Sequence, residues 1–573
     1  MSHYEIKNLS FSYAASPDRK TLDHVSLKIE RGQYITVCGR SGSGKTTLLK
    51  HLKSVLTPHG TTTGEILFEG TPLKDVDMRT QTLSIGYVMQ NPDSQIVTDK
   101  VWHELAFGLE SLGLEQQIIR TRVAEMASYF GIQGWFHKNV ADLSGGQKQL
   151  LNLASIMAMQ PSVLILDEPT SQLDPIAAAD FLNTVKKINR ELRTTIIITE
   201  HRLEDIFYAS DKVLVMEHGG VLAYDEPRKI GAFLKEQNNE MFAAMPTPVQ
   251  IYYGVNEQGT CPLTVREGAE WLDEMFAEKA PVHTRIEEDE KLAGAYGDKA
   301  KDIAAAMSKG EPIKDPAIAI KEAWFRYERD GADILKDLSL QVPRESIYAI
   351  VGGNGTGKST TLKTICNICR PYRGKVIVDG KPVAKHNQQE LFRGTLAMLP
   401  QDPQSLFAKM TVREELEEVL GFKDPDKAEK IAQVAETCEI TYLLDSHPYD
   451  ISGGEQQRAA LAKILLTNPK ILLMDEPTKG IDDFFKIKFA QIIKRLQSQG
   501  VTIVMVSHDV EFCAKYADYV SMFFDGSIVS TNTPNRFFSQ NSFYTTAANR
   551  MSRHVFENAI NNEDVITLCL KNQ

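Results

Sequence analysis

Short, nearly all-apolar runs occur in the same order in the two halves of the chain. Each half has three of them: 34–38, 163–166 and 195–199 in one, and 347–351, 471–474 and 501–506 in the other. Runs of this length without alternating polar positions are typical of strands buried on both faces of a parallel sheet. A helical segment follows the first run of each half. The pattern predicts one α/β fold used twice.

A glycine-rich loop follows the first apolar run of each half. Both copies read G-x-x-x-x-G-K followed by Thr or Ser, the phosphate-binding loop, and they begin at Gly39 and Gly352. The glycines let backbone N–H groups surround a phosphate, and the following helix N-terminus adds positive potential. We expect Lys45 and Lys358 to reach the terminal phosphates of a nucleotide, and Thr46 and Ser359 to ligate Mg²⁺.

The second apolar run ends in Asp-Glu in both halves. A carboxylate at the end of a buried strand is costly without a cation, so Asp167 and Asp475 are predicted to hold Mg²⁺. The next residues, Glu168 and Glu476, face differently and are predicted to be general bases that orient an attacking water. Two carboxylates at a helix start are the structural alternative.

The third run ends at a histidine in both halves, and the matched positions are almost evenly separated. The separations are 313 residues for Lys45 and Lys358, 311 for Gln90 and Gln401, 308 for Ser144 and Ser452 and for Asp167 and Asp475, and 307 for His201 and His508. We predict that the histidines sense a γ-phosphate, although a lone histidine is usually structural. The near-constant separation indicates a duplicated fold with small deletions in the second copy.

A serine-glycine-glycine segment in each half completes the motif set. Ser144-Gly145-Gly146-Gln147 and Ser452-Gly453-Gly454-Glu455, with the phosphate loop upstream and Asp-Glu downstream, resemble the signature of ATP-binding-cassette ATPases over about 1–230 and 317–535. The resemblance implies two tandem nucleotide-binding domains, each with a RecA-like core, an antiparallel β subdomain and a helical signature subdomain. It also implies head-to-tail pairing, in which the phosphate loop of one copy and the signature of the other enclose each ATP.

Two composite ATP sites with Mg²⁺ follow from the resemblance. The glutamines are expected to contact Mg²⁺ and the attacking water, the aspartates Asp174 and Asp482 to couple the sites, and Tyr13 and Tyr327 to stack on adenine. A core or surface aromatic is the alternative for each tyrosine. The remaining predicted nucleotide contacts are Ser41, Gly42, Gly44, Thr47, Asn354, Gly355, Gly357 and Thr360. Both sites retain every motif, and both are expected to hydrolyse ATP.

The segment around each glutamine resembles the ATPases of energy-coupling-factor vitamin importers, in which a short extra helix follows this loop. The resemblance implies a transmembrane scaffold and a separate substrate-binding membrane subunit as partners. Asp93, Ser94, Gln95 and Gln404 are the predicted scaffold contacts, with a solvated loop cap as the alternative. A tandem ATPase of a sugar importer and a soluble twin-cassette translation factor remain as rival functions.

Charge bears on the choice among these functions. A net charge of −11 argues against nucleic acid as the main partner, because nucleic-acid-binding proteins usually have a basic face. No apolar run approaches the roughly 20 residues that span a bilayer, and the first residues lack a secretory signal. We therefore expect a peripheral protein at the cytoplasmic face of the membrane.

The seven cysteines indicate no disulfide framework, and the C-x-x-C at Cys366 and Cys369 is expected to pack as small apolar residues.

The 573 residues exceed what one hydrophobic core supports. We predict a first nucleotide-binding domain at 1–235, an acidic and partly helical linker at 236–316, a second nucleotide-binding domain at 317–535 and a C-terminal extension at 536–573. In the linker, a capping box at Thr264 and Glu267 predicts a helix that continues to Phe276. The aromatic residues of the extension either seal an interface between the cassettes or cover the surface of one cassette.

Overall fold

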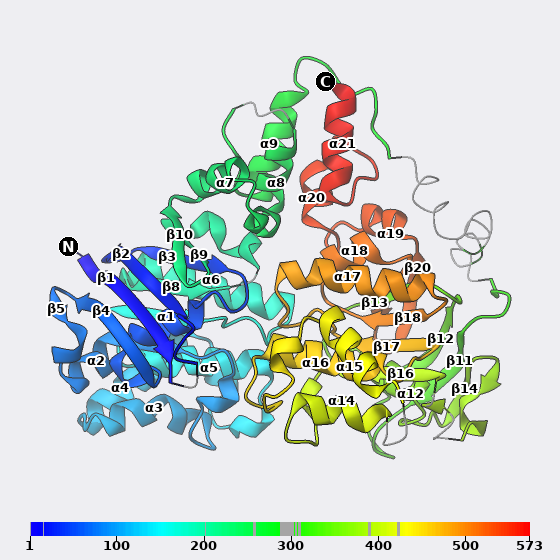
Figure 1. The fold of residues 1–573 in the computed structure, drawn as a ribbon, viewed down its shortest axis with the longest axis horizontal. Coiled ribbons are helices and arrows are strands. Elements are labelled where there is room, and N and C mark those ends of the chain that lie inside the picture. The colour runs from blue at the N-terminus through cyan, green and yellow to red at the C-terminus, as the bar shows by residue number, and fades with distance from the viewer. Residues whose placement is uncertain are drawn as a thin grey trace. The chain divides into compact units, whose positions relative to one another are not determined.

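A computed structural model describes residues 2–14, 16–200, 202–255, 259–286, 303, 306, 311–387, 391–392, 394–420 and 425–573. The chain divides into two compact units, Met1–Tyr253 with Gln258–Thr264, and Gly254–Glu257 with Val265–Gln573. We call them the first and the second unit (Figure 1). None of the helices among the described residues has the length and apolar composition needed to cross a membrane.

The first unit is built on a six-stranded sheet in the order β10-β9-β3-β8-β7-β6. Five of these strands are parallel and β10 is antiparallel to β9. The bounds are β3 (Tyr34–Gly39), β6 (Ile85–Val88), β7 (Val163–Asp167), β8 (Thr195–Thr199), β9 (Lys212–Glu217) and β10 (Gly220–Asp225). Every residue of β3, β6, β7 and β8 is buried. This burial explains why these segments are almost continuously apolar.

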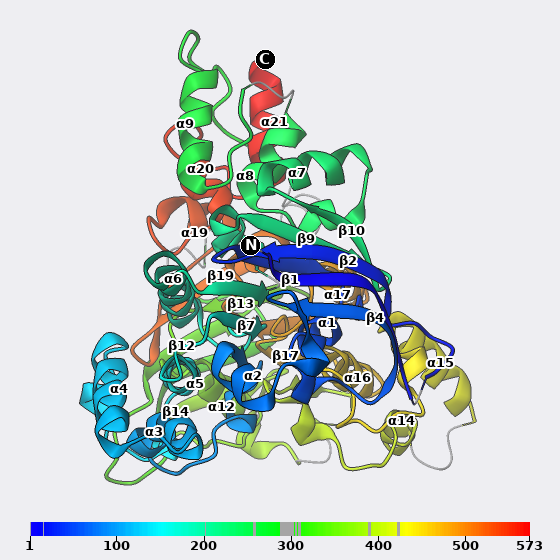
Figure 2. The ribbon, with the colours of Figure 1, turned by 90° about the vertical axis from the view of Figure 1, so that its left-hand side faces the viewer.

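A four-stranded antiparallel sheet and a set of helices complete the first unit. The sheet has the order β2-β1-β4-β5, with β1 (Ser2–Tyr13), β2 (Leu22–Glu30), β4 (Gly60–Phe68) and β5 (Thr71–Pro72). The helices are α1 (Lys45–His51), α2 (Met78–Ser84), α3 (Val101–Ser111), α4 (Gln116–Tyr129), α5 (Gly145–Met157), α6 (Pro175–Leu192), α7 (Pro227–Glu236) and α8 (Thr247–Gly254). Helices α3, α4 and α5 pack together as a helical subdomain (Figures 1 and 2).

The second unit repeats this arrangement. Its six-stranded sheet has the order β16-β17-β18-β13-β19-β20 and its antiparallel sheet the order β12-β11-β14-β15. The strands are β11 (Ile318–Phe325), β12 (Leu335–Val342), β13 (Ile347–Val351), β14 (Arg373–Val378), β15 (Lys381–Pro382), β16 (Leu396–Leu399), β17 (Ile471–Asp475), β18 (Thr502–Val506), β19 (Tyr519–Phe524) and β20 (Ser527–Asn532). The predicted fold, two tandem α/β nucleotide-binding domains with antiparallel subsheets, is confirmed.

The helices of the second unit include counterparts of the first and several of its own. They are α9 (Val265–Met275), α12 (Lys358–Ile365), α14 (Val412–Leu420), α15 (Lys427–Thr437), α16 (Gly453–Leu465), α17 (Asp483–Ser498), α18 (Val510–Tyr516), α19 (Pro534–Gln540), α20 (Ala547–Ser552) and α21 (Asn562–Asn572). Helix α9 packs against α20, and α20 against α21 (Figure 1). Phe537 and Phe538 are fully buried in the core of this unit. These two aromatic residues of the tail therefore pack within their own cassette.

Candidate nucleotide-binding sites

The first phosphate-binding loop runs from the end of β3 to the start of α1. Gly39 has φ 149°, and a Cβ at this position would lie 2.3 Å from the Met216 carbonyl oxygen, so the close approach to β9 requires glycine. The Lys45 Nζ donates hydrogen bonds to the carbonyl oxygens of Gly39 at 2.8 Å and Arg40 at 3.0 Å. The ammonium is therefore held at the mouth of the loop, where a phosphate would replace these carbonyl acceptors.

The Asp167 carboxylate lies at the end of β7 beside this loop. It accepts hydrogen bonds from the hydroxyl groups of Thr46 at 3.0 Å, Thr199 at 3.0 Å and Tyr87 at 3.2 Å. Burial, together with the neighbouring Glu168, raises the pKa of Asp167 despite these hydrogen bonds. A buried carboxylate next to a hydroxyl oxygen fits a divalent cation, which would supply the missing positive charge. Tyr87 and Thr199 are not among the residues predicted for the site, although both are polar residues within otherwise apolar runs.

Glu168 and Gln90 are brought together in the first unit. The Gln90 Nε2 donates a 2.8 Å hydrogen bond to the Glu168 Oε2. Glu168 has a positive φ of 45°, which turns its side chain away from the direction of Asp167. Its backbone N–H donates to the Thr199 hydroxyl at 2.9 Å, which fixes the turn. Glu168 is therefore placed differently from Asp167, as a base for an attacking water requires.

The second phosphate-binding loop has the same geometry. Gly352 has φ 155°, and a Cβ there would lie 2.2 Å from the Phe523 carbonyl oxygen. The Lys358 Nζ donates to the carbonyl oxygens of Gly352 at 3.0 Å and Gly353 at 2.7 Å. It also lies 3.5 Å from the His508 Nε2. This loop therefore presents its lysine as the first loop does, with an imidazole beside it.

The two acidic residues of the second unit occupy separate environments. The Ser359 hydroxyl donates a 3.0 Å hydrogen bond to Asp475, whose pKa is raised by burial. Glu476 accepts a hydrogen bond from the His508 backbone N–H at 3.1 Å, and its Oε1 lies 3.2 Å from the His508 Nε2. Burial raises the pKa of Glu476 to about 7, although the His508 N–H and the Lys358 ammonium oppose the shift. A carboxylate with a pKa near neutrality is well matched to proton transfer.

The two predicted adenine-stacking tyrosines lie beside the helices that follow the loops. The Tyr13 hydroxyl is 3.0 Å from the Thr47 Oγ1, and the Tyr327 hydroxyl is 3.1 Å from the Thr360 Oγ1. Tyr327 is 58% exposed. The two tyrosines therefore make equivalent contacts, across 34 residues in the first unit and 33 in the second.

The serine of each signature segment caps a helix. Ser144 precedes α5 and forms a capping box with Gln147, and Ser452 precedes α16 and forms one with Glu455. In the second unit the Ser452 hydroxyl also donates a 2.8 Å hydrogen bond to the Glu455 carboxylate. Burial by itself would raise the pKa of Glu455. Hydrogen bonds from Tyr442 and Ser452 outweigh this effect and hold the pKa below its ordinary value. The two signature segments therefore share a shape and differ by one negative charge.

The other predicted residues have simpler settings. Asp174 caps α6 through the backbone N–H groups of Ile176 and Ala177, and Asp482 caps α17 through that of Phe485. Gln401 is exposed. His201 lies outside the described residues. Ser41, Gly42, Gly44, Asn354, Gly355 and Gly357 form the body of the two phosphate loops, and Gly145, Gly146, Gly453 and Gly454 form the first turns of the signature helices.

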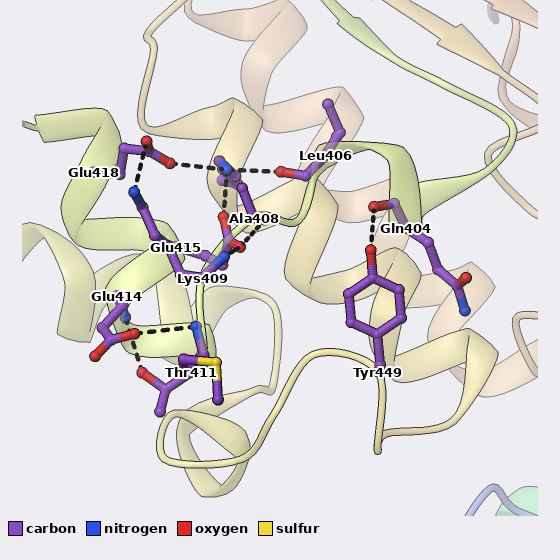
Figure 3. Close-up of polar contacts among 11 residues, drawn as sticks. Gln404, Leu406, Ala408, Lys409, Thr411, Glu414, Glu415, Glu418 and Tyr449 are labelled. Carbon is purple, nitrogen blue, oxygen red and sulfur yellow. Dashed lines mark hydrogen bonds and ion pairs between the residues drawn. The ribbon is translucent and has the colours of Figure 1, made fainter.

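A short 3-10 helix follows each predicted Gln loop. It is η3 (Pro92–Ser94) in the first unit and η10 (Pro403–Leu406) in the second. Asn91 and Asp402 cap them by accepting a hydrogen bond from the backbone N–H two residues later. In the second unit, the Tyr449 hydroxyl donates to the Gln404 carbonyl oxygen at 3.4 Å (Figure 3). Each loop is therefore followed by a folded turn with a side-chain cap.

The fold and the two loop sites define a P-loop nucleoside triphosphate hydrolase that is present twice in one chain. The family model of ABC transporters matches residues 22–171 and 335–479. A protein of Bacillus cereus with the name of an ABC transporter ATP-binding protein is 39% identical over 570 residues, which cover 99% of this chain and 98% of that protein. A protein of the same description from Methanosarcina acetivorans is 31% identical over 533 residues, 91% of this chain and 84% of that protein.

Among solved structures, cbiO1 from Clostridium perfringens, described as part of the ABC transporter complex cbiONQ, is 30% identical. It covers 41% of this chain and 94% of its own, with a TM-score of 0.37. The family model and the full-length relatives show that the chain belongs to the ABC transporter ATP-binding proteins. It is an ABC transporter ATPase that binds ATP and energises a transporter, and this role implies membrane transporter partners.

Proposed function

We propose that the chain powers an energy-coupling-factor importer for a vitamin or another micronutrient. In this proposal it is a peripheral subunit at the cytoplasmic face of the membrane. One partner is a transmembrane scaffold, and a separate membrane subunit binds the substrate. The observation that supports this function best is the folded turn after each Gln loop, at the place where the resemblance expects an extra helix.

The turn in the first unit is held by its own side chains. The Gln95 Oε1 accepts a hydrogen bond from the Met89 N–H at 2.9 Å, and its Nε2 donates to the Tyr87 carbonyl oxygen at 2.8 Å. Lys148 of α5 pairs with Asp93 at 2.6 Å. Gln95 therefore positions the turn, while Asp93 and Ser94 remain exposed for a partner.

Apolar side chains are exposed next to this turn. Val97 is 67% exposed, Trp102 is 42% exposed and Phe107 is 39% exposed. All three lie between the turn and the end of α3. Exposed aromatic and aliphatic side chains beside a rigid turn are typical of a protein interaction surface. This supports the docking of a scaffold segment on the helical subdomain.

The chemistry that we propose uses two composite ATP sites, formed by intramolecular head-to-tail pairing of the cassettes. Lys45 and Lys358 bind phosphates, and Glu168 and Glu476 accept a proton from the attacking water. Bound Mg²⁺ would neutralise phosphate charge, and Asp167 and Asp475 are suited to hold it. ATP and ADP differ in their affinity for the closed state, and this difference drives the partner.

The test is affinity capture of the tagged chain from detergent-solubilised membranes, with mass spectrometry of the captured proteins. We expect a multi-span scaffold and a small substrate-binding membrane protein. Val97→Asp should lose both, while Leu192→Asp, a change at a similarly exposed side chain on α6 (56% exposed), should retain them. Capture of ribosomal proteins without membrane proteins would refute the proposal. A soluble substrate-binding protein with sugar-type permeases would favour the sugar importer instead.

A further inference from the structure

The segment that follows α19 reaches the second phosphate-binding loop. The backbone N–H of Gly352, the first glycine of this loop, donates a 3.2 Å hydrogen bond to the Tyr544 hydroxyl. The carbonyl oxygen of the same glycine accepts from the Lys358 Nζ. The glycine is therefore tied on one side to the C-terminal extension and on the other to the lysine that faces the phosphates.

Tyr544 itself is fixed by its neighbours in sequence. The Thr545 hydroxyl donates to the Phe538 carbonyl oxygen at 2.6 Å and lies 3.1 Å from the Asn549 Oδ1. The backbone N–H of Ala547, the first residue of α20, donates to the Glu511 carboxylate at 2.7 Å. Burial raises the pKa of Tyr544, so its hydroxyl stays protonated and neutral. The hydroxyl is thus a fixed, uncharged acceptor behind the loop.

The extension also holds the helix that follows His508. Helix α18 begins at Val510, and its Glu511 accepts the hydrogen bond from α20. One turn later, Lys515 of α18 pairs with Glu563 of α21 at 2.5 Å. The C-terminal extension therefore contacts both the phosphate loop and the helix that follows His508.

The C-terminal extension also forms hydrogen bonds with the linker that precedes the second cassette. The backbone N–H groups of Val282 and His283 donate to the Asn572 Oδ1 at 2.7 and 2.9 Å. The Ile286 N–H donates to the Asn558 Oδ1 at 2.8 Å. These contacts join the two ends of the second unit. The extension is therefore packed into this unit, and its contacts hold Tyr544 in position.

The first unit supports its phosphate loop differently. The segment after α7 contacts that loop through an ion pair between Glu240 and Arg40 at 2.8 Å, and their side chains are 73% and 45% exposed. An exposed ion pair contributes little and weakens with salt. The second loop instead has a partly buried hydrogen bond to a neutral hydroxyl.

We propose that Tyr544 is a positioning residue of the second ATP site, and that its hydroxyl holds Gly352, and through it Lys358, in the geometry that binds the nucleotide phosphates. This inference rests on the proposed role of the Gly352–Ser359 loop as a phosphate site. It adds a residue from outside the cassette motifs to that site.

The test measures binding of a fluorescent ATP analogue to the full chain in which Lys45→Ala removes phosphate binding at the first loop. In this background, Tyr544→Phe keeps the ring and removes the hydroxyl. We expect the affinity to fall about two- to tenfold, the range of one hydrogen bond. In steady-state hydrolysis the KM for ATP should rise by the same factor, with kcat unchanged.

Tyr516→Phe is the matched control, because Tyr516 packs on the same core and its ring lies 4.9 Å from that of Phe512 on α18. It should leave the affinity unchanged. Wild-type affinity in Tyr544→Phe, or an equal loss in Tyr516→Phe, would overturn the inference. Lys358→Ala separates this result from the site assignment. If Lys358→Ala retains full binding in the Lys45→Ala background, the loop is not the phosphate site and the assignment fails together with the inference.

Discussion

A buried ion pair holds the connection between η10 and α14 in the second unit. The Glu415 side chain is 1% exposed and pairs with Lys463 of α16, which is 15% exposed. Glu415 also accepts hydrogen bonds from the backbone N–H groups of Ala408 and Lys409, as Figure 3 shows. The Lys463 ammonium donates to the Leu406 carbonyl oxygen at 2.8 Å. One carboxylate and one ammonium thus fix the backbone next to the proposed docking turn.

Replacing Glu415 by Gln should loosen this connection. The amide oxygen of Gln can still accept from the two backbone N–H groups, but the negative charge opposite Lys463 is lost. Breaking a buried pair costs roughly 3–5 kcal/mol. Part of this cost is offset, because Glu418 remains 3.6 Å from the Lys463 ammonium. We therefore expect a loss of about 2 kcal/mol, which corresponds to about a 30-fold more frequent opening of the loop.

The measurement is hydrogen exchange with mass spectrometry on peptides that cover 406–412. Local opening controls exchange in the native state, so the Ala408 and Lys409 amides should exchange faster in Glu415→Gln. Glu418→Gln is the matched control: its side chain is 46% exposed, and such a pair contributes roughly 0–1 kcal/mol.

A double variant tests the reason for the effect. Lys463→Met in the Glu415→Gln background removes the unpaired buried charge and should restore part of the protection. Unchanged exchange in Glu415→Gln would refute the reasoning, as would equal acceleration in Glu418→Gln.

The first unit has Glu104 in the place of Glu415, but Ser155 in the place of Lys463. The Glu104 carboxylate accepts hydrogen bonds from the backbone N–H groups of Val97 and Thr98.

Three further outcomes are expected at the ATP sites. Glu168→Gln and Glu476→Gln should each keep ATP binding and remove a large part of the hydrolysis, since a general base contributes roughly 10²–10⁴-fold; normal turnover in both single variants would contradict the assignment. With Glu168→Gln present, kcat/KM should fall about tenfold per pH unit below about 7, because protonation of Glu476, whose pKa is raised to about 7, removes the base; a flat profile down to pH 5.5 would exclude this role. Glu455→Gln should strengthen ATP binding about two- to fivefold at the site that Ser452 is proposed to close, because it removes a negative charge beside the proposed γ-phosphate contact. Equilibrium binding of ATP measures this change, and weaker binding would contradict the prediction.

The strands and the helix starts at the sites could be predicted because local signals specify them. An all-apolar run such as 163–166 is buried as β7, whose last residue is Asp167. Thr264, where the sequence predicts the start of a helix that continues to Phe276, directly precedes α9, which spans Val265–Met275. In each case the signal comes from a few adjacent residues, so the local sequence pattern was sufficient to predict the element.

Contacts between distant segments could not be predicted in this way. Nothing near Tyr544 in sequence indicates that its hydroxyl meets Gly352, since 191 residues lie between them and the contact depends on how α19 and α20 pack. The same holds for Tyr87, which lies 80 residues before Asp167. Motif spacing identifies the residues that face a ligand, whereas the residues behind them are set by tertiary packing.

The two sites show why equal motifs do not imply equal chemistry. Asp167 accepts hydrogen bonds from Tyr87 and Thr199 in addition to the loop threonine, whereas Met398 and Val506 occupy the corresponding positions near Asp475 and have no hydroxyl group. A carboxylate with more donors is better stabilised as an anion before a cation binds, so it gains less from that cation.

The catalytic glutamates differ in the same manner. Among the residues that the structure describes, Glu168 receives a hydrogen bond from the amide of Gln90, and Glu476 contacts the imidazole of His508. An imidazole can donate or accept a proton, whereas an amide only donates or accepts a hydrogen bond, so the described contact of Glu476 has an acid–base character that the Gln90 contact lacks. Matching motifs therefore place a glutamate at the same point of each site without giving it the same described hydrogen-bond partner.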